Sequence, residues 1–127
     1  LAIAGWSGTP TYYCDKWDGS VWAVTSVYLS QFEKLNTVGT TSSCFGVGGR
    51  DYLGLTYSPL CYFFNGSAWT TTLSLNIGRQ LHASAGNYSN CLTFAGTSGS
   101  ELTSNELWNG VVWSTINDTN IRRRNLA

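Results

Sequence analysis

The sequence predicts an all-β protein made of repeated, four-stranded antiparallel units. Charged residues make up only 11% of the 127 residues, against about 25% in an average soluble domain, while Gly, Ser, Thr, Asn and aromatic residues are abundant. A six-residue motif also occurs three times: an aromatic residue, Asp or Asn, Gly, any two residues, and Trp. The composition favours strands and turns, and the recurrence indicates a repeat architecture.

The overall charge limits the classes of partner that we expect the chain to bind. Seven basic and seven acidic side chains give a net charge of zero, and only residues 122–124 form a basic run. We therefore expect no nucleic-acid partner. The apolar stretches are too short to cross a bilayer, so we also expect no membrane insertion.

The motif occupies residues 17–22, 64–69 and 108–113, so its copies are 47 and 44 residues apart. Asp-Gly or Asn-Gly between two apolar runs is the signal for a type I′ turn, in which two residues have positive φ. Each copy is therefore predicted to contain a tight hairpin. Its turn would contain Gly19, Gly66 or Gly110.

A pair of small residues stands upstream of each motif, as Ala4-Gly5, Gly48-Gly49 and Ala95-Gly96. Such a pair lets a strand end against a crowded neighbour without a Cβ clash. Arg79 and Arg123 each follow a motif Trp by ten residues, so residues 123–127 align with residues 79–83. The repeat positions that we expect to form the structural frame are Gly5, Trp17, Gly19, Trp22, Gly49, Phe64, Gly66, Trp69, Arg79, Gly96, Trp108, Gly110, Trp113 and Arg123. We expect the five Trp of this set to lie in the core.

Each period is predicted to contain four strands, which in the central copy are residues 35–42, 44–48, 60–64 and 67–73. Four antiparallel strands in such a period are typical of a β-propeller blade. The copies cover approximately residues 1–43, 44–90 and 91–127 of one domain, giving twelve strands in about three blades. Because a propeller needs about four to eight blades, we expect the ring to be completed by further sequence of a longer polypeptide, which we favour, or by other chains.

With the small-residue pair, the motif aromatic and the later Trp in place, the sequence resembles the kelch repeat family, which includes the propeller of galactose oxidase. It is most similar to the degenerate kelch-like arrays of phage virion proteins and bacterial surface proteins. The resemblance covers essentially the whole chain and implies a kelch-like β-propeller. Two features depart from the family pattern: the Gly pair is Ala-Gly in two copies, and the usual Tyr is replaced by Trp17, Phe64 and Trp108.

Candidate catalytic residues are few. The single His, His82, occupies the repeat position of Leu35 and Leu126, so we expect it to be packed in the core, and one His cannot hold a metal alone. The copper site of galactose oxidase needs two His. We therefore predict that the chain is not an enzyme and that it holds no metal and no cofactor.

The four cysteines are not spaced as zinc ligands, and we expect them to be buried free thiols. Cys44 and Cys61 should lie on neighbouring strands in diagonal positions. Asn65, Asn87 and Asn117 each begin an Asn-x-Ser or Asn-x-Thr sequence, which the composition explains without glycosylation.

The candidate binding residues are Trp6, Arg50, Asp51 and Tyr52. We expect them in the loops that follow the small-residue pairs, and these loops differ in length and sequence between copies. In repeat proteins such a variable face usually carries the function.

The sequence therefore predicts a structural or recognition propeller that contacts other protein chains, or the remainder of the propeller, in a phage particle or a cell-surface assembly. Two alternatives stay open. A propeller lectin would stack aromatic loop residues on a glycan, although lectin propellers tend to repeat their ligand residues in every blade. An intracellular kelch adaptor in the cytoplasm would be compatible with free cysteines.

Overall fold

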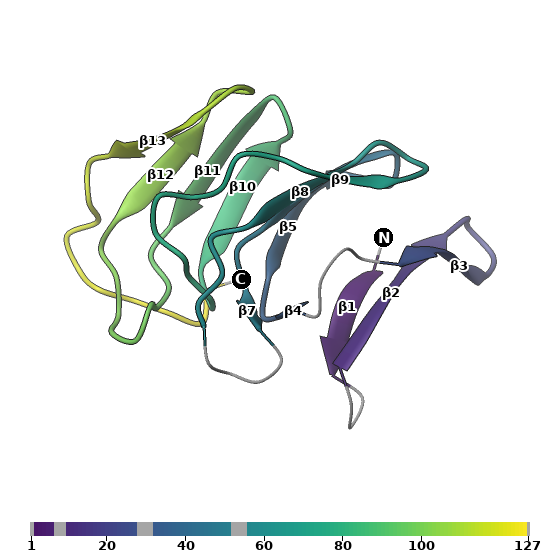
Figure 1. Cartoon of the computed structure of the whole chain (residues 1–127), viewed down its shortest axis with the longest axis horizontal. Coiled ribbons are helices and arrows are strands. Elements are labelled where there is room, and N and C mark those ends of the chain that lie inside the picture. The colour runs from purple at the N-terminus through teal and green to yellow at the C-terminus, as the bar shows by residue number, and fades with distance from the viewer. Residues whose placement is uncertain (1, 7–9, 28–31, 52–55, 127) are drawn as a thin grey trace.

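The computed structural model describes residues 2–6, 10–27, 32–51 and 56–126, and for residues 2–6, 10–12, 25–27 and 32 it describes the backbone only (Figure 1). Within these residues every regular element is a β-strand, and every pairing is antiparallel. The predicted all-β class is confirmed. No helix of the described chain has the length and apolar character needed to span a membrane.

The central sheet, here called unit 2, has four strands in the order β5-β6-β8-β9. The strands are β5 (Asn36–Thr40), β6 (Ser43–Val47), β8 (Cys61–Phe64) and β9 (Trp69–Thr71). All four predicted strands of the central copy are therefore present, within a few residues of the expected ends.

Unit 3 repeats this sheet with the order β10-β11-β12-β13. Its strands are β10 (Ala83–Asn87), β11 (Asn90–Phe94), β12 (Asn105–Trp108) and β13 (Trp113–Ile116). Unit 1 has three strands, β1 (Ala2–Trp6), β2 (Pro10–Trp17) and β3 (Trp22–Val27), in sequence order. Each sheet of units 2 and 3 begins with the strand that ends the preceding sequence copy.

The expectation of twelve strands in three four-stranded sheets is wrong in two respects. The described part of unit 1 has three strands and not four. In addition, β4 (Phe32–Glu33) and β7 (Arg50–Asp51) pair as a separate two-stranded sheet. This pair forms where the chain enters unit 2 and where it leaves β6, segments that sequence spacing treats as loops. The described residues form no closed ring.

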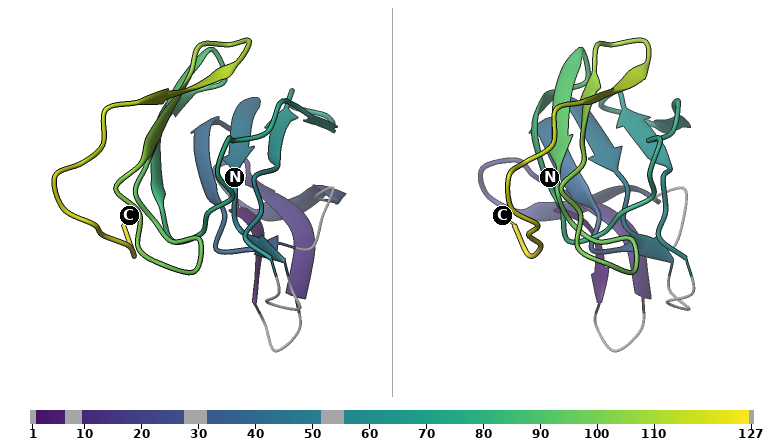
Figure 2. Two further views of the ribbon diagram at one scale, coloured as in Figure 1. Left: turned by 60° about the vertical axis from the view of Figure 1, so that its left-hand side comes forward. Right: turned by 90° about the vertical axis from the view of Figure 1, so that its left-hand side faces the viewer.

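The three units are stacked face to face, and the core lies between them (Figure 2). On β8, alternate side chains serve different neighbours, since Cys61 belongs to the cluster between units 2 and 3, while Tyr62 and Phe64 belong to the cluster between units 1 and 2. Unit 2 is therefore buried on both faces. The first cluster comprises Val38, Phe45, Val47, Cys61, Leu75, Cys91, Trp108 and Trp113, and the second comprises Cys14, Cys44, Tyr62, Phe64 and Trp69.

The hairpin of the repeated motif differs from the predicted type I′ turn. Among the described residues of these turns only the glycines have positive φ: 109° at Gly19, 97° at Gly66 and 92° at Gly110. The Asp or Asn before each Gly instead accepts two backbone hydrogen bonds, from the second and third residues after it, at 2.8–3.0 Å. The loop has four residues because this side chain takes the place of a turn hydrogen bond.

The small-residue pair allows a strand to end close to a neighbouring segment, as predicted. Gly48 and Gly49 have φ of 62° and 109°, and Ala95 and Gly96 adopt the same backbone with 58° and 91°. A Cβ added at Gly48 would lie 2.7 Å from the Arg79 carbonyl oxygen, and one added at Gly96 would lie 2.7 Å from the Gln80 carbonyl oxygen. Both contacts are too short for a side chain, so glycine is required at these two positions.

Candidate functional site

The structure places three of the four predicted binding residues in strands or at strand ends. Trp6 is the last residue of β1 and pairs with Pro10, and Arg50 and Asp51 form β7 opposite β4. Their placement in loops was therefore wrong, because these residues extend the sheets by short pairings that the repeat does not share. Tyr52 lies outside the described residues.

Asp51 has a structural contact of its own. Its carboxylate accepts hydrogen bonds from the hydroxyl of Thr56 at 2.8 Å and from the amide of Thr56 at 3.3 Å, and its own amide donates to the Thr56 carbonyl. These bonds join the end of β7 to Thr56, so Asp51 has a structural role there.

The segments that differ between units gather along one side of the molecule, the lower side in Figure 1. We call this side the loop edge and define it as the β4–β7 pair together with residues 97–103. In unit 3 its shape is set by local bonds, since Thr103 donates to Asp118 at 2.7 Å and Thr119 donates its amide to the Thr103 carbonyl at 2.9 Å. Unit 2 uses the β4–β7 pairing at the same edge, so the two loops differ in structure as well as in sequence.

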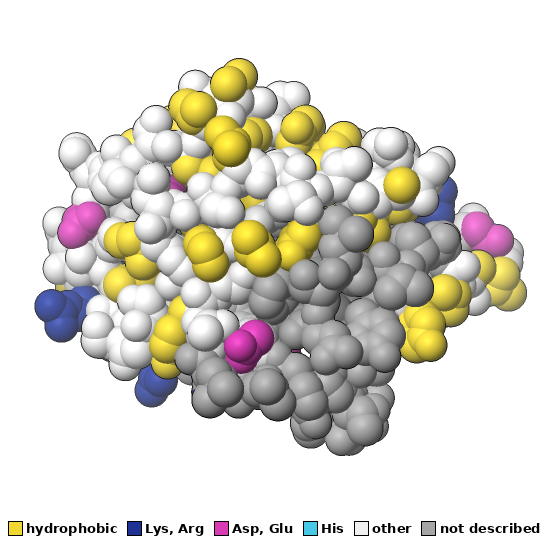
Figure 3. All heavy atoms as spheres, viewed as in Figure 1, with side chains coloured by type: hydrophobic (Ala, Val, Ile, Leu, Met, Phe, Trp, Pro, Cys, Tyr) yellow, Lys and Arg dark blue, Asp and Glu magenta, His cyan; other side chains and the backbone are white. Residues whose placement is uncertain are grey.

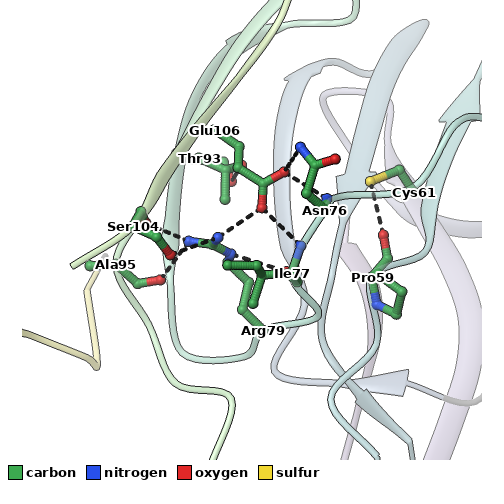
Figure 4. A network of polar contacts seen from close by, with 10 residues as sticks. Pro59, Cys61, Asn76, Ile77, Arg79, Thr93, Ala95, Ser104 and Glu106 are labelled. Carbon is green, nitrogen blue, oxygen red and sulfur yellow. Dashed lines mark hydrogen bonds and ion pairs between the residues drawn. The ribbon is translucent and has the colours of Figure 1, made fainter. Parts of the chain in front are cut away.

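A buried ion pair joins the segment before unit 3 to the sheet of unit 3 (Figure 4). The guanidinium of Arg79 lies 2.8 Å from the carboxylate of Glu106 on β12, and both side chains are almost fully buried. Arg79 also donates to the carbonyls of Ala95 and Ser104, at 3.0 and 2.7 Å. Burial lowers the pKa of Arg79, and the negative charge of Glu106 opposes this shift.

Glu106 accepts further bonds from the backbone that leads to Arg79. The Asn76 amide donates at 2.7 Å, the Asn76 side chain at 2.9 Å and the Ile77 amide at 3.1 Å. Arg79, a predicted frame residue, thus orders a loop, but the carboxylate that holds the loop was not predicted. The sequence does contain a signal for this carboxylate, because Asp15 precedes the first motif by the same two residues by which Glu106 precedes the third.

His82 is buried, as predicted, with its side chain against Gly48 and Gly96. Burial, and then the positive charge of Arg79, lower its pKa to about 3. The Val47 backbone nearby opposes this shift, but neither ring nitrogen makes a well-formed hydrogen bond with a described residue. The imidazole is therefore a neutral core group wedged between units 2 and 3.

All four cysteines are buried thiols, as predicted. Cys44 pairs with Phe64, and Cys61 pairs with Val47, so the two cysteines lie at opposite ends of the β6–β8 ladder. Burial raises the pKa of Cys44 to about 11 and that of Cys61 to about 12. In the described chain no three His, Cys, Asp or Glu side chains cluster as metal ligands would.

The prediction that all five motif Trp lie in the core is wrong for Trp17 and Trp22. Trp69, Trp108 and Trp113 are at most 7% exposed, whereas Trp17 is 44% exposed and Trp22 is 57% exposed. The difference follows from position, because the motif aromatics of units 2 and 3 pack against the preceding unit and those of unit 1 have no described unit in front of them. Hydrophobic side chains reach the surface around β3 (Figure 3).

No family model matches the chain, and the search of curated proteins found no match.

Proposed function

We propose that the protein is a kelch-type β-propeller module that recognises another protein through its loop edge. The proposal rests on the contrast between the repeated structural frame and the loop edge. The hairpins, the small-residue pairs and the inter-unit cores repeat from unit to unit, while the segments at the loop edge do not.

The propeller arrangement is supported by the way the units pack. Units 2 and 3 are four-stranded sheets in simple sequence order, as blades are. Their first strands, β5 and β10, lie against each other, as the innermost strands of adjacent blades would. Further units, from a longer polypeptide or from other chains, would complete the ring.

Recognition at the loop edge is consistent with how repeat proteins generally bind partners. A rigid frame holds loops of unlike sequence on one side, and such loops can be changed without loss of the core. The β4–β7 pair and the Thr103–Asp118 contact hold the described parts of these loops in place. Ordered loops bind with a smaller entropic cost than disordered ones.

The setting that we propose is a phage particle or a cell-surface assembly. Its support is the resemblance described above and a composition with few charges and much Gly, Ser, Thr and Asn.

Site-specific photo-cross-linking in the native particle or cell would test the proposal. A photoreactive residue at Ser100 in the loop edge, or at Thr56 beside β7, both exposed, should yield discrete adducts with another protein. The matched control is Ser67, which is exposed in the hairpin between β8 and β9 and belongs to the repeated frame. Equal adducts from all three positions, or none from the loop edge, would contradict the proposal. Binding on a glycan array, lost on changing the loop edge, would favour the lectin alternative instead.

A further inference from the structure

The face of unit 1 that is turned away from unit 2 has the composition of a junction between units. We call it the unit 1 face and define it as Asp15, Trp17 and Trp22. Trp17 and Trp22 form a tilted ring pair 5.5 Å apart, matching the buried pairs of Trp108 with Trp113 at 5.6 Å and Phe64 with Trp69 at 5.1 Å. The exposed pair is thus already in the geometry that the other units bury.

Asp15 completes the likeness to the junction between units 2 and 3. It stands two residues before the motif aromatic, at the repeat position of Glu106. Unlike Glu106, it is half-buried and makes no ion pair with any described residue.

At the other end of the molecule, residues 120–123 repeat the loop that receives Glu106. Asn120, Ile121 and Arg123 match Asn76, Ile77 and Arg79 in type. The backbone that follows is also the same. The Arg79 and Arg123 carbonyls accept bonds from Gly49 and Gly96, and the residue two positions later has φ of 54° in the first case and 58° in the second. The three matching residues are exposed, and Arg123 forms no described ion pair.

A second signal comes from Asn105 on β12, whose buried side-chain oxygen has no hydrogen-bond partner among the described residues. The counterparts of Asn105 three residues before the other motifs are Cys14 and Cys61. Cys14 accepts the indole N–H of Trp69 from the next unit at 3.2 Å, and Cys61 lies in the same cluster as Trp113. The repeat therefore points a motif Trp of a following unit at Asn105.

We propose that a second copy of this chain docks its unit 1 face on unit 3, with Asp15 received by residues 120–123 and the indole of Trp22 donating to Asn105. This inference rests on the proposed propeller arrangement. Among the described residues the Asp15 carboxylate and the Arg123 guanidinium form no ion pair, and the Asn105 side-chain oxygen has no donor. The contact would give each of these groups a partner.

Two identical junctions related by a twofold axis would join two copies into six units, a number at which propellers close. Every charged or hydrogen-bonding group in the proposed contact lies on β2, β3, β12 or residues 120–123. The junction therefore does not depend on a fourth strand in unit 1. Leu92, Phe94 and Leu107 of unit 3 are partly buried and would supply apolar surface to the Trp pair.

Sedimentation equilibrium and light scattering of the 127-residue chain over a wide concentration range would test this. We expect a discrete two-chain species. Arg123→Glu or Asp15→Arg should each weaken association by about 100-fold or more, as breaking a buried ion pair does. The variant that carries both changes should associate again, because the charges are exchanged.

The matched control is Arg124→Glu, since Arg124 is a neighbouring arginine already paired with Glu101 on the surface. It should leave association unchanged. Trp22→Phe should weaken association without unfolding, and Asn105→Leu in the same chain should recover part of the loss. Circular dichroism of each variant would verify that its sheets are intact.

A wild-type chain that is monomeric at all concentrations, or association that is insensitive to Arg123→Glu, would overturn the proposal. One of these two results is expected if a further unit of a longer polypeptide, and not a second copy, covers the unit 1 face. A folded monomer would leave the loop-edge role standing, because photo-cross-linking tests that role separately. Conversely, a failure of cross-linking would leave the two-chain contact intact.

Discussion

Replacing Glu106 by Gln would measure the free energy that the buried ion pair contributes to the contact between units 2 and 3. The substitution keeps the size of the side chain and one oxygen, but it removes the charge opposite Arg79. Glu106 now accepts four hydrogen bonds, three of them from Asn76 and Ile77. A glutamine side chain would accept through one oxygen only, so the Arg79 guanidinium or part of the loop would lose its partner.

The expected cost follows from burial. Removing one partner of a buried ion pair destabilises proteins by about 3–5 kcal/mol, and the retained amide oxygen places Glu106→Gln near the lower end, at about 3 kcal/mol. Domains are stable by only about 5–15 kcal/mol, so the loss would be a large share of the total. The same change at Glu101 is the matched control. That carboxylate pairs with Arg124 at 3.1 Å on the surface, where both side chains are about half exposed, and such pairs contribute about 0–1 kcal/mol.

Denaturant unfolding, followed by Trp fluorescence at one protein concentration, would provide both free energies of unfolding. The prediction is a difference of about 2 kcal/mol or more between Glu106→Gln and Glu101→Gln. Losses that agree within about 0.5 kcal/mol would refute the claim that the pair is buried in an inter-unit contact. The double variant Arg79→Leu, Glu106→Leu should lose less than the sum of its two single changes, because neither charge is left alone.

Three further predictions concern the core. Because His82 has a pKa of about 3 in the folded chain and about 6.5 when unfolded, its contribution is fully present above pH 6.5 and is lost as the pH falls toward 3, by up to about 1.4 kcal/mol per pH unit. His82→Leu should remove this dependence, and thermal unfolding of both proteins at pH 5 and pH 7.5 would check it; equal pH dependence would contradict the burial. Trp69→Ala should lower the free energy of unfolding by about 3–5 kcal/mol, whereas Trp22→Ala at the same repeat position should lower that of the monomer by less than about 1 kcal/mol. Equal denaturation midpoints for the two variants would refute the distinction between covered and uncovered motifs. The four thiols should not react with Ellman's reagent at pH 8 until the chain is unfolded, because they are buried and the pKa values of Cys44, Cys61 and Cys91 are raised; rapid reaction of the native protein would show that they are accessible.

Much of the fold could be predicted because it depends on local chemistry that each copy repeats. Short apolar runs form strands such as β6 and β8, and Asp or Asn followed by Gly marks the hairpin of each repeated motif. The prediction failed on the type of turn, since the side chain of the Asp or Asn, and not a second residue with positive φ, supplies the turn geometry. The Gly pairs were understood correctly, because close backbone approach leaves a direct trace in the sequence.

The candidate site was harder to predict. Trp6, Arg50 and Asp51 were chosen because their segments differ between the sequence copies. These residues extend sheets through strand pairings that the repeat does not predict. Glu106 was missed although Arg79 was identified, because a sequence shows that a residue recurs but does not show which side chain it contacts 27 residues away.

Residues 17–22, 64–69 and 108–113 show what the repeat establishes and what it leaves open. The period identifies strands, hairpins and an inward-facing aromatic at each motif, because these depend on neighbours along the chain. Burial depends on which unit lies in front of each sheet, a relation between distant segments. For this reason Trp69 is covered while Trp22 is exposed. Likewise Glu106 lies in a buried ion pair, while Asp15, at the same repeat position, forms no ion pair with a described residue.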